Sequence, residues 1–262
     1  MVHPTILTRY RRLIAAAALL LVLPGAAADA GRAAVIERIK PSIVAVGTFE
    51  RLRNPQFHFA GTGFAVDDGL LIATNAHVLP RSLAVERDEV LAVAVRGADG
   101  KVTARAARTL AADSSIDLAL LRIPGPPLAA LALGDSEAVR EGETVLFTGY
   151  PIGAVLGLYP VTHMAMIASI TPIAIPAPNS GKLDARTVRR LASGSFPVFQ
   201  LDGTAYPGNS GSPVYDAGSG RVIAIVNSVV VKSTRESALS QPTGITYAIP
   251  AQRLRELLEA AR

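Results

Sequence analysis

The chain contains no cysteine and no tryptophan, and it has only four histidines among its 262 residues. The lack of cysteine excludes a disulfide framework and a zinc site built from thiolates. Small secreted domains often depend on disulfides, but a chain of this length can bury a sizeable core without them. We therefore expect a protein held together by its hydrophobic core alone.

Strong charge of one sign is also missing. The formal net charge is +5, and no run of Lys or Arg occurs after Arg12. A balance this mild does not indicate nucleic acid as a partner. Beyond the N-terminus only His58, His77 and His163 remain, and none has a second ligand-type residue at zinc spacing. We expect neither a metal site nor a cofactor.

The N-terminus has the pattern of an export signal. Three arginines lie between positions 9 and 12, and an apolar run of 11 residues follows, Leu13–Leu23. That run is too short to span a bilayer comfortably and is typical of a signal peptide. Small residues after Pro24 offer cleavage sites near Asp29, although an uncleaved anchor is the alternative. We expect a signal peptide over residues 1–30 and a mature protein over 31–262, which carries a formal net charge of +3, is periplasmic or secreted in a bacterium, and has no stable membrane association.

The mature chain has short apolar runs separated by Gly, Pro and Asp, a pattern that predicts an all-β protein. A short helix is expected over Ala33–Lys40, ended by Pro41, and an amphipathic helix over 251–262. The sequence Val85–Asp88 fits a hairpin turn. The sequence Pro124–Pro127 is the best boundary between two halves, about 35–123 and 131–250. Twelve strands are predicted: Ser42–Thr48, Gly63–Val66, Leu70–Ala73, Val90–Val95, Lys101–Ala107, Leu118–Ile123, Thr144–Thr148, Met164–Ile170, Pro197–Leu201, Ser212–Tyr215, Val222–Val231 and Gly244–Ile249.

Three motifs in a fixed order carry the chemistry. They are Ala73–Val78, which contains His77; Asp113–Leu120, which contains Asp117; and Pro207–Pro213, which contains Ser210. Each motif alone is more often a strand end or a turn than a catalytic element. Three of them together, each placed at the end or start of a predicted strand, favour a Ser-His-Asp triad.

Each residue type answers a chemical need. A serine hydroxyl becomes a nucleophile when a base takes its proton, and histidine suits that role near neutral pH. A buried carboxylate then orients the base and stabilises its cation. Asp117 is the better candidate because it opens a predicted strand that would fix its position, whereas Asp113 more plausibly caps the preceding turn. The backbone N–H groups of Gly208 and Ser210 would stabilise the oxyanion.

The motifs resemble those of the HtrA/Deg-type serine proteases in the trypsin-like superfamily. The resemblance is carried by Gly61–Phe64 with Leu71–Val78, by Leu133–Gly153, by Leu201–Gly211 and by Thr246–Pro250. It covers roughly residues 35 to 260 and implies a chymotrypsin-like fold of two antiparallel six-stranded β-barrels with the triad in the cleft between them. It implies proteins or peptides as substrates.

The sequence also departs from that family. Ser212 stands where HtrA enzymes usually carry a second glycine, and Tyr150 replaces the usual Asn of Gly-Asn-Pro. The chain ends about where the protease domain of the family ends, so we expect no PDZ domain. Asn209 precedes the nucleophile and has no charge to pair with a freed N-terminal amine, which disfavours activation of the digestive-protease kind. Monomer and trimer both stay open.

The pocket for the substrate residue before the scissile bond should be lined by residues near Thr204 and by Val226–Val231. No acidic residue occurs in Val226–Val231 to hold Arg or Lys, and no histidine occurs there to hold Glu. A small or medium apolar side chain should therefore be preferred. The expected substrate-binding residues are Thr204, Val226, Asn227, Ser228 and Val229.

Three other functions compete with that of an exported serine endopeptidase. One is a non-catalytic protease homologue that captures peptides without cleaving them. Another is a glutamyl-endopeptidase-like enzyme, which Ser212 favours and the missing histidine disfavours. A serine esterase is a third, but that class usually has Gly-x-Ser-x-Gly in an α/β chain with a late histidine.

Overall fold

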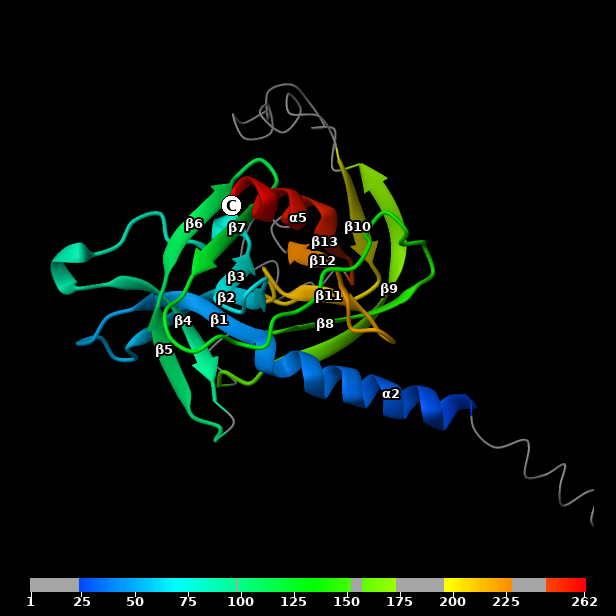
Figure 1. Cartoon of the computed structure of the whole chain (residues 1–262), viewed down its shortest axis with the longest axis horizontal. Helices are drawn as coiled ribbons and strands as arrows, with labels where there is room; N and C mark the ends of the chain where they lie inside the picture. The colour runs from blue at the N-terminus through cyan, green and yellow to red at the C-terminus, as the bar shows by residue number, and fades with distance from the viewer. Residues whose placement is uncertain (1–23, 98, 152–156, 173–195, 228–243) are drawn as a thin grey trace, which may run out of the picture.

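The computed structural model describes residues 24–97, 99–151, 157–172, 196–227 and 244–262. Within these residues the chain forms two β-sheet units side by side, with a helix at each end (Figure 1). Most of the expected signal peptide, part of the Val222–Val231 strand, and the expected pocket residues Ser228 and Val229 lie outside the described residues.

The first unit is a seven-stranded antiparallel sheet in the order β5-β4-β1-β2-β3-β7-β6. Its two edge strands, β5 and β6, are consecutive in the chain and separated by Ala107 alone. The two strands act as one long strand that bends at Ala107, pairing with β4 before the bend and with β7 after it, so the chain itself joins the two edges. The strands are β1 Ile43–Phe49, β2 Phe57–Val66, β3 Leu71–Thr74, β4 Val90–Arg96, β5 Val102–Ala106, β6 Arg108–Asp113 and β7 Leu118–Arg122.

The second unit is a closed six-stranded barrel in the order β10-β13-β12-β11-β8-β9. Its neighbouring strands are antiparallel throughout. The two units together confirm the expected chymotrypsin-like fold. The strands are β8 Thr144–Gly149, β9 Val161–Pro172, β10 Pro197–Leu201, β11 Pro213–Asp216, β12 Val222–Asn227 and β13 Thr246–Pro250.

Several strands are buried on both faces because each barrel has its own core and a third cluster fills the space between the barrels. Leu121 of β7 lies in the core of the first barrel, whereas Leu118 and Leu120 of the same strand face the cluster between the barrels. Phe147 and Val226 lie in the core of the second barrel. Burial on both faces explains why these strands read as continuous apolar runs rather than alternating ones.

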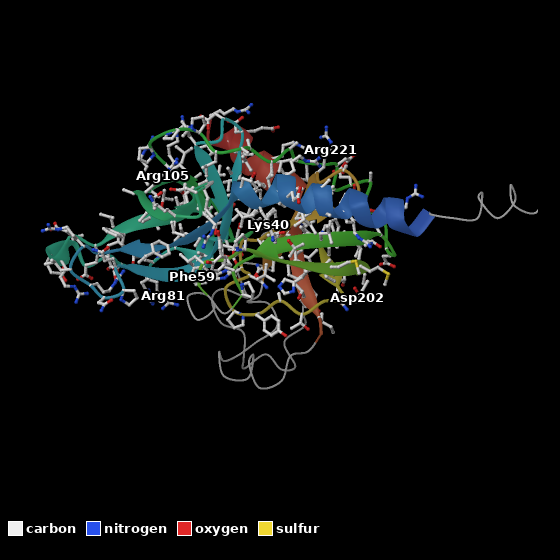
Figure 2. All side chains as sticks on the ribbon, turned by 90° about the horizontal axis from the view of Figure 1, so that it is seen from below. Lys40, Phe59, Arg81, Arg105, Asp202 and Arg221 are labelled. Carbon is white, nitrogen blue, oxygen red and sulfur yellow. The ribbon has the colours of Figure 1, made fainter. Side chains whose placement is uncertain are left out.

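The two helices differ in how they meet the barrels. The C-terminal helix α5, Ala251–Ala260, buries Leu254 and Leu258 and lies across β7 and β12, as its amphipathic pattern predicts (Figure 1). The N-terminal helix α2, Pro24–Ile39, packs on the barrels at its C-terminal end and projects beyond them (Figures 1 and 2). It begins nine residues before the expected start, because alanines of high helix propensity precede Ala33.

Two local expectations were wrong. Strand β6 was not expected, because its side chains are mostly exposed and carry no apolar alternation. The Val85–Asp88 sequence, expected as a hairpin turn, forms a 3-10 helix over Val85–Arg87 that ends at Asp88 in the left-handed region. A salt bridge between Arg53 and Glu89 ties the end of this segment to the β1–β2 loop.

Candidate active site

His77 lies in a 3-10 helix, Ala76–Val78, directly after β3. Its Nδ1 atom is 2.7 Å from Oδ2 of Asp117. Its backbone N–H donates to the other carboxylate oxygen, Oδ1, at 2.9 Å. Because a carboxylate accepts hydrogen bonds only, this contact places the ring proton on Nδ1 and leaves Nε2 able to accept a proton.

Asp117 is fixed by its backbone as well as by its side chain. It has a φ of 58°, a left-handed conformation that is uncommon for residues other than glycine. Its carbonyl oxygen accepts from the side-chain amide of Asn75 at 3.0 Å and from the N–H of Ala76 at 3.2 Å. The carboxylate is 1% exposed. The strained turn is thus tied to the segment that carries the histidine.

Asp113, the other candidate for the carboxylate, forms hydrogen bonds within its own turn. Its Oδ1 accepts from the backbone N–H of Ser115 at 2.7 Å and from the Ser115 hydroxyl. These hydrogen bonds lower the pKa of Asp113 against the opposing effect of burial, which is the largest single influence. No contact joins Asp113 to His77 among the described residues.

Asn227 at the end of β12 completes the surroundings of the carboxylate. Its Nδ2 donates to Oδ2 of Asp117 at 3.0 Å, and its side chain is buried. The two oxygens of Asp117 therefore receive three donors, from the ring and backbone of His77 and from Asn227. The sequence placed Asn227 in the substrate pocket and gave no signal for this contact, which joins residues 110 positions apart.

Ser210 lies in the tight loop before β11 and is 7% exposed. Hydrogen bonds within the loop run from Asn209 N–H to Tyr206 O and from Ser212 N–H to Asn209 O, both at 3.0 Å. The loop needs glycine at 211, where φ is +87° and an added Cβ would lie 2.0 Å from the carbonyl oxygen of Thr62. This packing explains the Gly-Asn-Ser-Gly pattern of the motif.

Two backbone donors are free beside the nucleophile. Neither the N–H of Gly208 nor that of Ser210 has an acceptor among the described residues. Gly208 has a φ of +103°, a conformation in which any other residue would be strained. Free, preorganised donors next to a serine are what an oxyanion requires.

His77 and Ser210, the expected base and nucleophile, are both described and are not in hydrogen-bond contact with one another in this structure. Such contacts are often long in proteins without substrate and tighten when substrate binds. His77 and Asp117 are therefore already hydrogen-bonded, whereas a hydrogen bond between His77 and Ser210 would still have to form.

Buried polar groups surround the nucleophile loop. The side-chain amide of Asn209 and the hydroxyl of Ser212 have no hydrogen-bond partner among the described residues, and both residues are fully buried. Tyr150 is also buried, and burial raises the pKa of its phenol to about 12. Its hydroxyl stays protonated and donates to the carbonyl oxygen of Ile43 in β1 at 3.2 Å, across the barrel boundary.

The expected substrate pocket is only partly described. Val226 is fully buried in the core of the second barrel, and Ala205 packs against that core. Thr204 is partly exposed at the start of the nucleophile loop, which Thr246 anchors through a hydrogen bond from Ala205 N–H at 2.8 Å. Of the expected pocket residues that the structure describes, Val226 and Asn227 are therefore buried, and Thr204 is partly exposed.

Two negative findings apply to the residues that the structure describes. None of the helices among them combines the length and hydropathy that a bilayer crossing needs. In the same ranges no group of three His, Cys, Asp or Glu is placed to hold a metal ion.

HtrA-type proteases are among the solved structures that resemble this one. The HtrA-type protease AlgW with tripeptide matches with a TM-score of 0.61 and 25% identity, over 87% of this chain and 62% of that one. Deg5 matches with a TM-score of 0.59 and 22% identity, over 87% and 92%. Both likenesses support the fold.

Sequence comparisons with curated proteins and with a family model also find serine proteases and a trypsin-like peptidase domain. Serine protease HTRA4 of Mus musculus is 31% identical over 87% of this chain, and a probable periplasmic serine endoprotease DegP-like of Halomonas elongata is 31% identical over 72%. The matches span 40% and 32% of those longer proteins. The family model of the trypsin-like peptidase domain matches residues 61–225. The chain therefore belongs to the trypsin-like peptidase family and has HtrA and DegP serine proteases among its relatives.

Proposed function

We propose that this protein is an exported serine endopeptidase that cleaves proteins through a Ser210-His77-Asp117 triad. The observation that carries the proposal is the double contact of Asp117 with His77, at 2.7 Å to the ring and 2.9 Å to the backbone. A carboxylate held in this way fixes both the tautomer and the direction of the imidazole. A protein that only captured peptides would not need that arrangement.

The reaction follows from these positions. Ser210 Oγ attacks the scissile carbonyl while His77 Nε2 takes its proton, and Asp117 stabilises the imidazolium that forms. The N–H groups of Gly208 and Ser210 stabilise the negative oxygen of the tetrahedral intermediate. His77 then gives the proton to the leaving amine, and the acyl-enzyme remains on Ser210. Water, activated by the same histidine, releases the acyl group.

The proposed substrates are extended protein segments with a small or medium apolar residue before the cut. Thr204, Val226, Asn227, Ser228 and Val229 would form the pocket. The lack of acidic residues in Val226–Val231 supports an apolar preference, and the partly buried Ala205, next to Thr204, packs against the apolar core of the second barrel. A desolvated Arg or Lys would lack a partner there, which is costly.

The experiment that tests the reaction compares the purified mature protein with Ser210→Ala. The wild type should react with a fluorophosphonate probe and digest casein, and the variant should lose turnover by several orders of magnitude, on the order of 10⁶-fold if chemistry limits the rate. If the probe labels the wild type but the wild type leaves casein intact, the result would favour an esterase. Equal turnover by both proteins would refute the triad, and a wild type inert in both assays would favour the non-catalytic homologue.

The pocket and the export have tests of their own. The peptides released from a proteome digest should end mainly in Val, Ala or Leu, and a profile dominated by Glu, Arg or Lys would refute the pocket. Export is supported by the signal-like N-terminus and by the periplasmic DegP-like relative. Mass spectrometry of the exported protein should find an N-terminus near Asp29 or Gly31, and an intact Met1 would contradict cleavage.

A further inference from the structure

Thr62 in β2 is fully buried and makes four hydrogen bonds around the nucleophile loop. Its backbone N–H donates to Ser210 O at 2.9 Å, and its hydroxyl donates to Gly208 O at 2.7 Å. The hydroxyl accepts from Tyr150 N–H at 3.0 Å, and its carbonyl accepts from Thr74 at 2.7 Å. One residue of the first barrel therefore holds two carbonyl groups of a loop that belongs to the second barrel.

The direction of the hydroxyl proton is determined by its partners. A threonine hydroxyl has one proton and can also accept. The N–H of Tyr150 can only donate, and the carbonyl of Gly208 can only accept. The hydroxyl proton must therefore point at Gly208 O, which makes Thr62 a relay between the end of β8 and the nucleophile loop.

The two carbonyls held by Thr62 flank the proposed oxyanion donors. Between them, the carbonyl of Asn209 accepts from Ser212 N–H, so the three consecutive peptide planes from Gly208 to Gly211 are each held at their oxygen. The N–H of Ser210 lies in the same peptide plane as the carbonyl of Asn209. The hydrogen bond from Ser212 N–H to that carbonyl therefore fixes the direction of the Ser210 N–H.

The other donor is confined by packing as well. A Cβ placed on Gly208 would lie 2.3 Å from Tyr150 O and 2.9 Å from the Phe59 ring, so the Cα of Gly208 has a wall on that side. Phe59 also packs edge-on against Tyr150, with ring centroids 6.2 Å apart. Figure 2 labels Phe59 among the strands of the first barrel, toward the middle of the molecule. The hydrogen bond from Thr62 to Gly208 O fixes the peptide plane that follows this Cα, so the Cα that carries the donor N–H is limited by packing on one side and by Thr62 on the other.

We propose that Thr62 is a positioning residue for the oxyanion donors: its hydroxyl, through Gly208 O, holds the backbone that follows the N–H of Gly208, and its own N–H holds Ser210 O. This inference rests on the proposed serine-protease function and deepens it. Thr62 touches neither His77 nor Asp117 through any contact among the described residues, so its effect should fall on the oxyanion and not on the base.

The experiment compares Thr62→Ala with Thr62→Ser, because these two variants differ only by the hydroxyl. The assay uses a peptide with the best-cleaved sequence from the proteome digest, in three forms: the substrate, its boronic acid and its carboxamide. The boronic acid forms a tetrahedral adduct that needs the oxyanion donors, whereas the carboxamide binds without one. Loss of a whole oxyanion donor typically costs about 10²- to 10³-fold in kcat. A pair of donors that is present but points in the wrong direction should lower kcat less, on the order of 10- to 100-fold.

We expect Thr62→Ala to lower kcat and boronic acid affinity by that factor while KM and carboxamide affinity stay near the wild-type values. Thr62→Ser should resemble the wild type in all four. Equal behaviour of the two variants, or a parallel loss of boronic acid and carboxamide affinity, would overturn the proposal. If Thr62→Ala does not fold, Thr62→Val replaces it, and failure of both while Thr62→Ser folds would assign the hydroxyl to stability and likewise overturn the proposal.

Ser210→Ala separates this result from the proposed function. Turnover that survives Ser210→Ala would refute the protease mechanism itself. Turnover that depends on Ser210 but is indifferent to the Thr62 hydroxyl would leave the mechanism intact and refute only the role of Thr62.

Discussion

Replacing Asp117 with asparagine tests the site at its most constrained point. Three donors converge on the two carboxylate oxygens: His77 Nδ1 at 2.7 Å, His77 N–H at 2.9 Å and Asn227 Nδ2 at 3.0 Å. A carboxylate satisfies all three because both of its oxygens accept. An asparagine has one accepting oxygen and one donating NH₂ group, so it must fail at one of the two positions.

Each orientation of the new amide has a definite cost. If the NH₂ group faces the ring, His77 must accept at Nδ1 and carry its proton on Nε2, where it cannot act as the base toward Ser210. If the NH₂ group faces the backbone N–H of His77, two donors meet at about the original distance and a buried group is left unsatisfied, at roughly 1–3 kcal/mol. In a well-characterised serine protease the equivalent change lowers kcat about 10⁴-fold through the wrong tautomer. We expect a loss on the order of 10³- to 10⁴-fold here.

The assay measures kcat and KM for the best-cleaved peptide, with thermal unfolding as a check on folding. Asp113→Asn is the matched control, because Asp113 is a nearby carboxylate whose hydrogen bonds stay within its own turn. We expect Asp113→Asn to keep wild-type turnover and Asp117→Asn to lose it with KM little changed. A folded Asp117→Asn protein within tenfold of wild type would refute the reasoning, as would an equal loss in the control.

Two further predictions concern stability. Glu89 accepts from Thr48, from the N–H of Ala84 and from Arg53, and these contacts lower its pKa from 4.5 to about 2. A depressed carboxyl pKa stabilises the fold above pH 4.5 and ceases to do so as the pH falls toward 2. Glu89→Gln should therefore cost roughly 1–2 kcal/mol at pH 7, and urea titrations should show the difference vanishing between pH 4.5 and 2; a constant difference would contradict the account. Gly149→Ala should unfold or inactivate the protein, because its Cβ would lie 1.9 Å from the Ser212 hydroxyl. Adding Ser212→Gly should restore part of the stability, since contacts of 2.9 Å with Asn209 and Thr62 remain, and Gly31→Ala, with open space around it, should melt like the wild type.

The sequence by itself determined the fold class and predicted the candidate catalytic residues. Gly, Pro and Asp between apolar runs mark strand ends whatever surrounds them, so most strands and the helix at 251–260 could be predicted within a few residues. The motifs around His77, Asp117 and Ser210 are local for the same reason, because each encodes its own turn. Strand β6 was missed because its exposed side chains carry no pattern, and its pairing depends on the bend at Ala107.

The tertiary structure decided what holds the site in place. The contact of Asn227 with Asp117 joins positions 110 apart, and that of Thr62 with Gly208 joins positions 146 apart. Neither can be read from local periodicity, because a buried amide or hydroxyl has the same sequence signature whichever donor or acceptor it meets. Only the packing of the first barrel against the second brings β2 under the loop that carries Ser210 and the end of β12 beside the carboxylate of Asp117. Local motifs therefore predicted the candidate reacting groups, and long-range packing set the directions in which those side chains point.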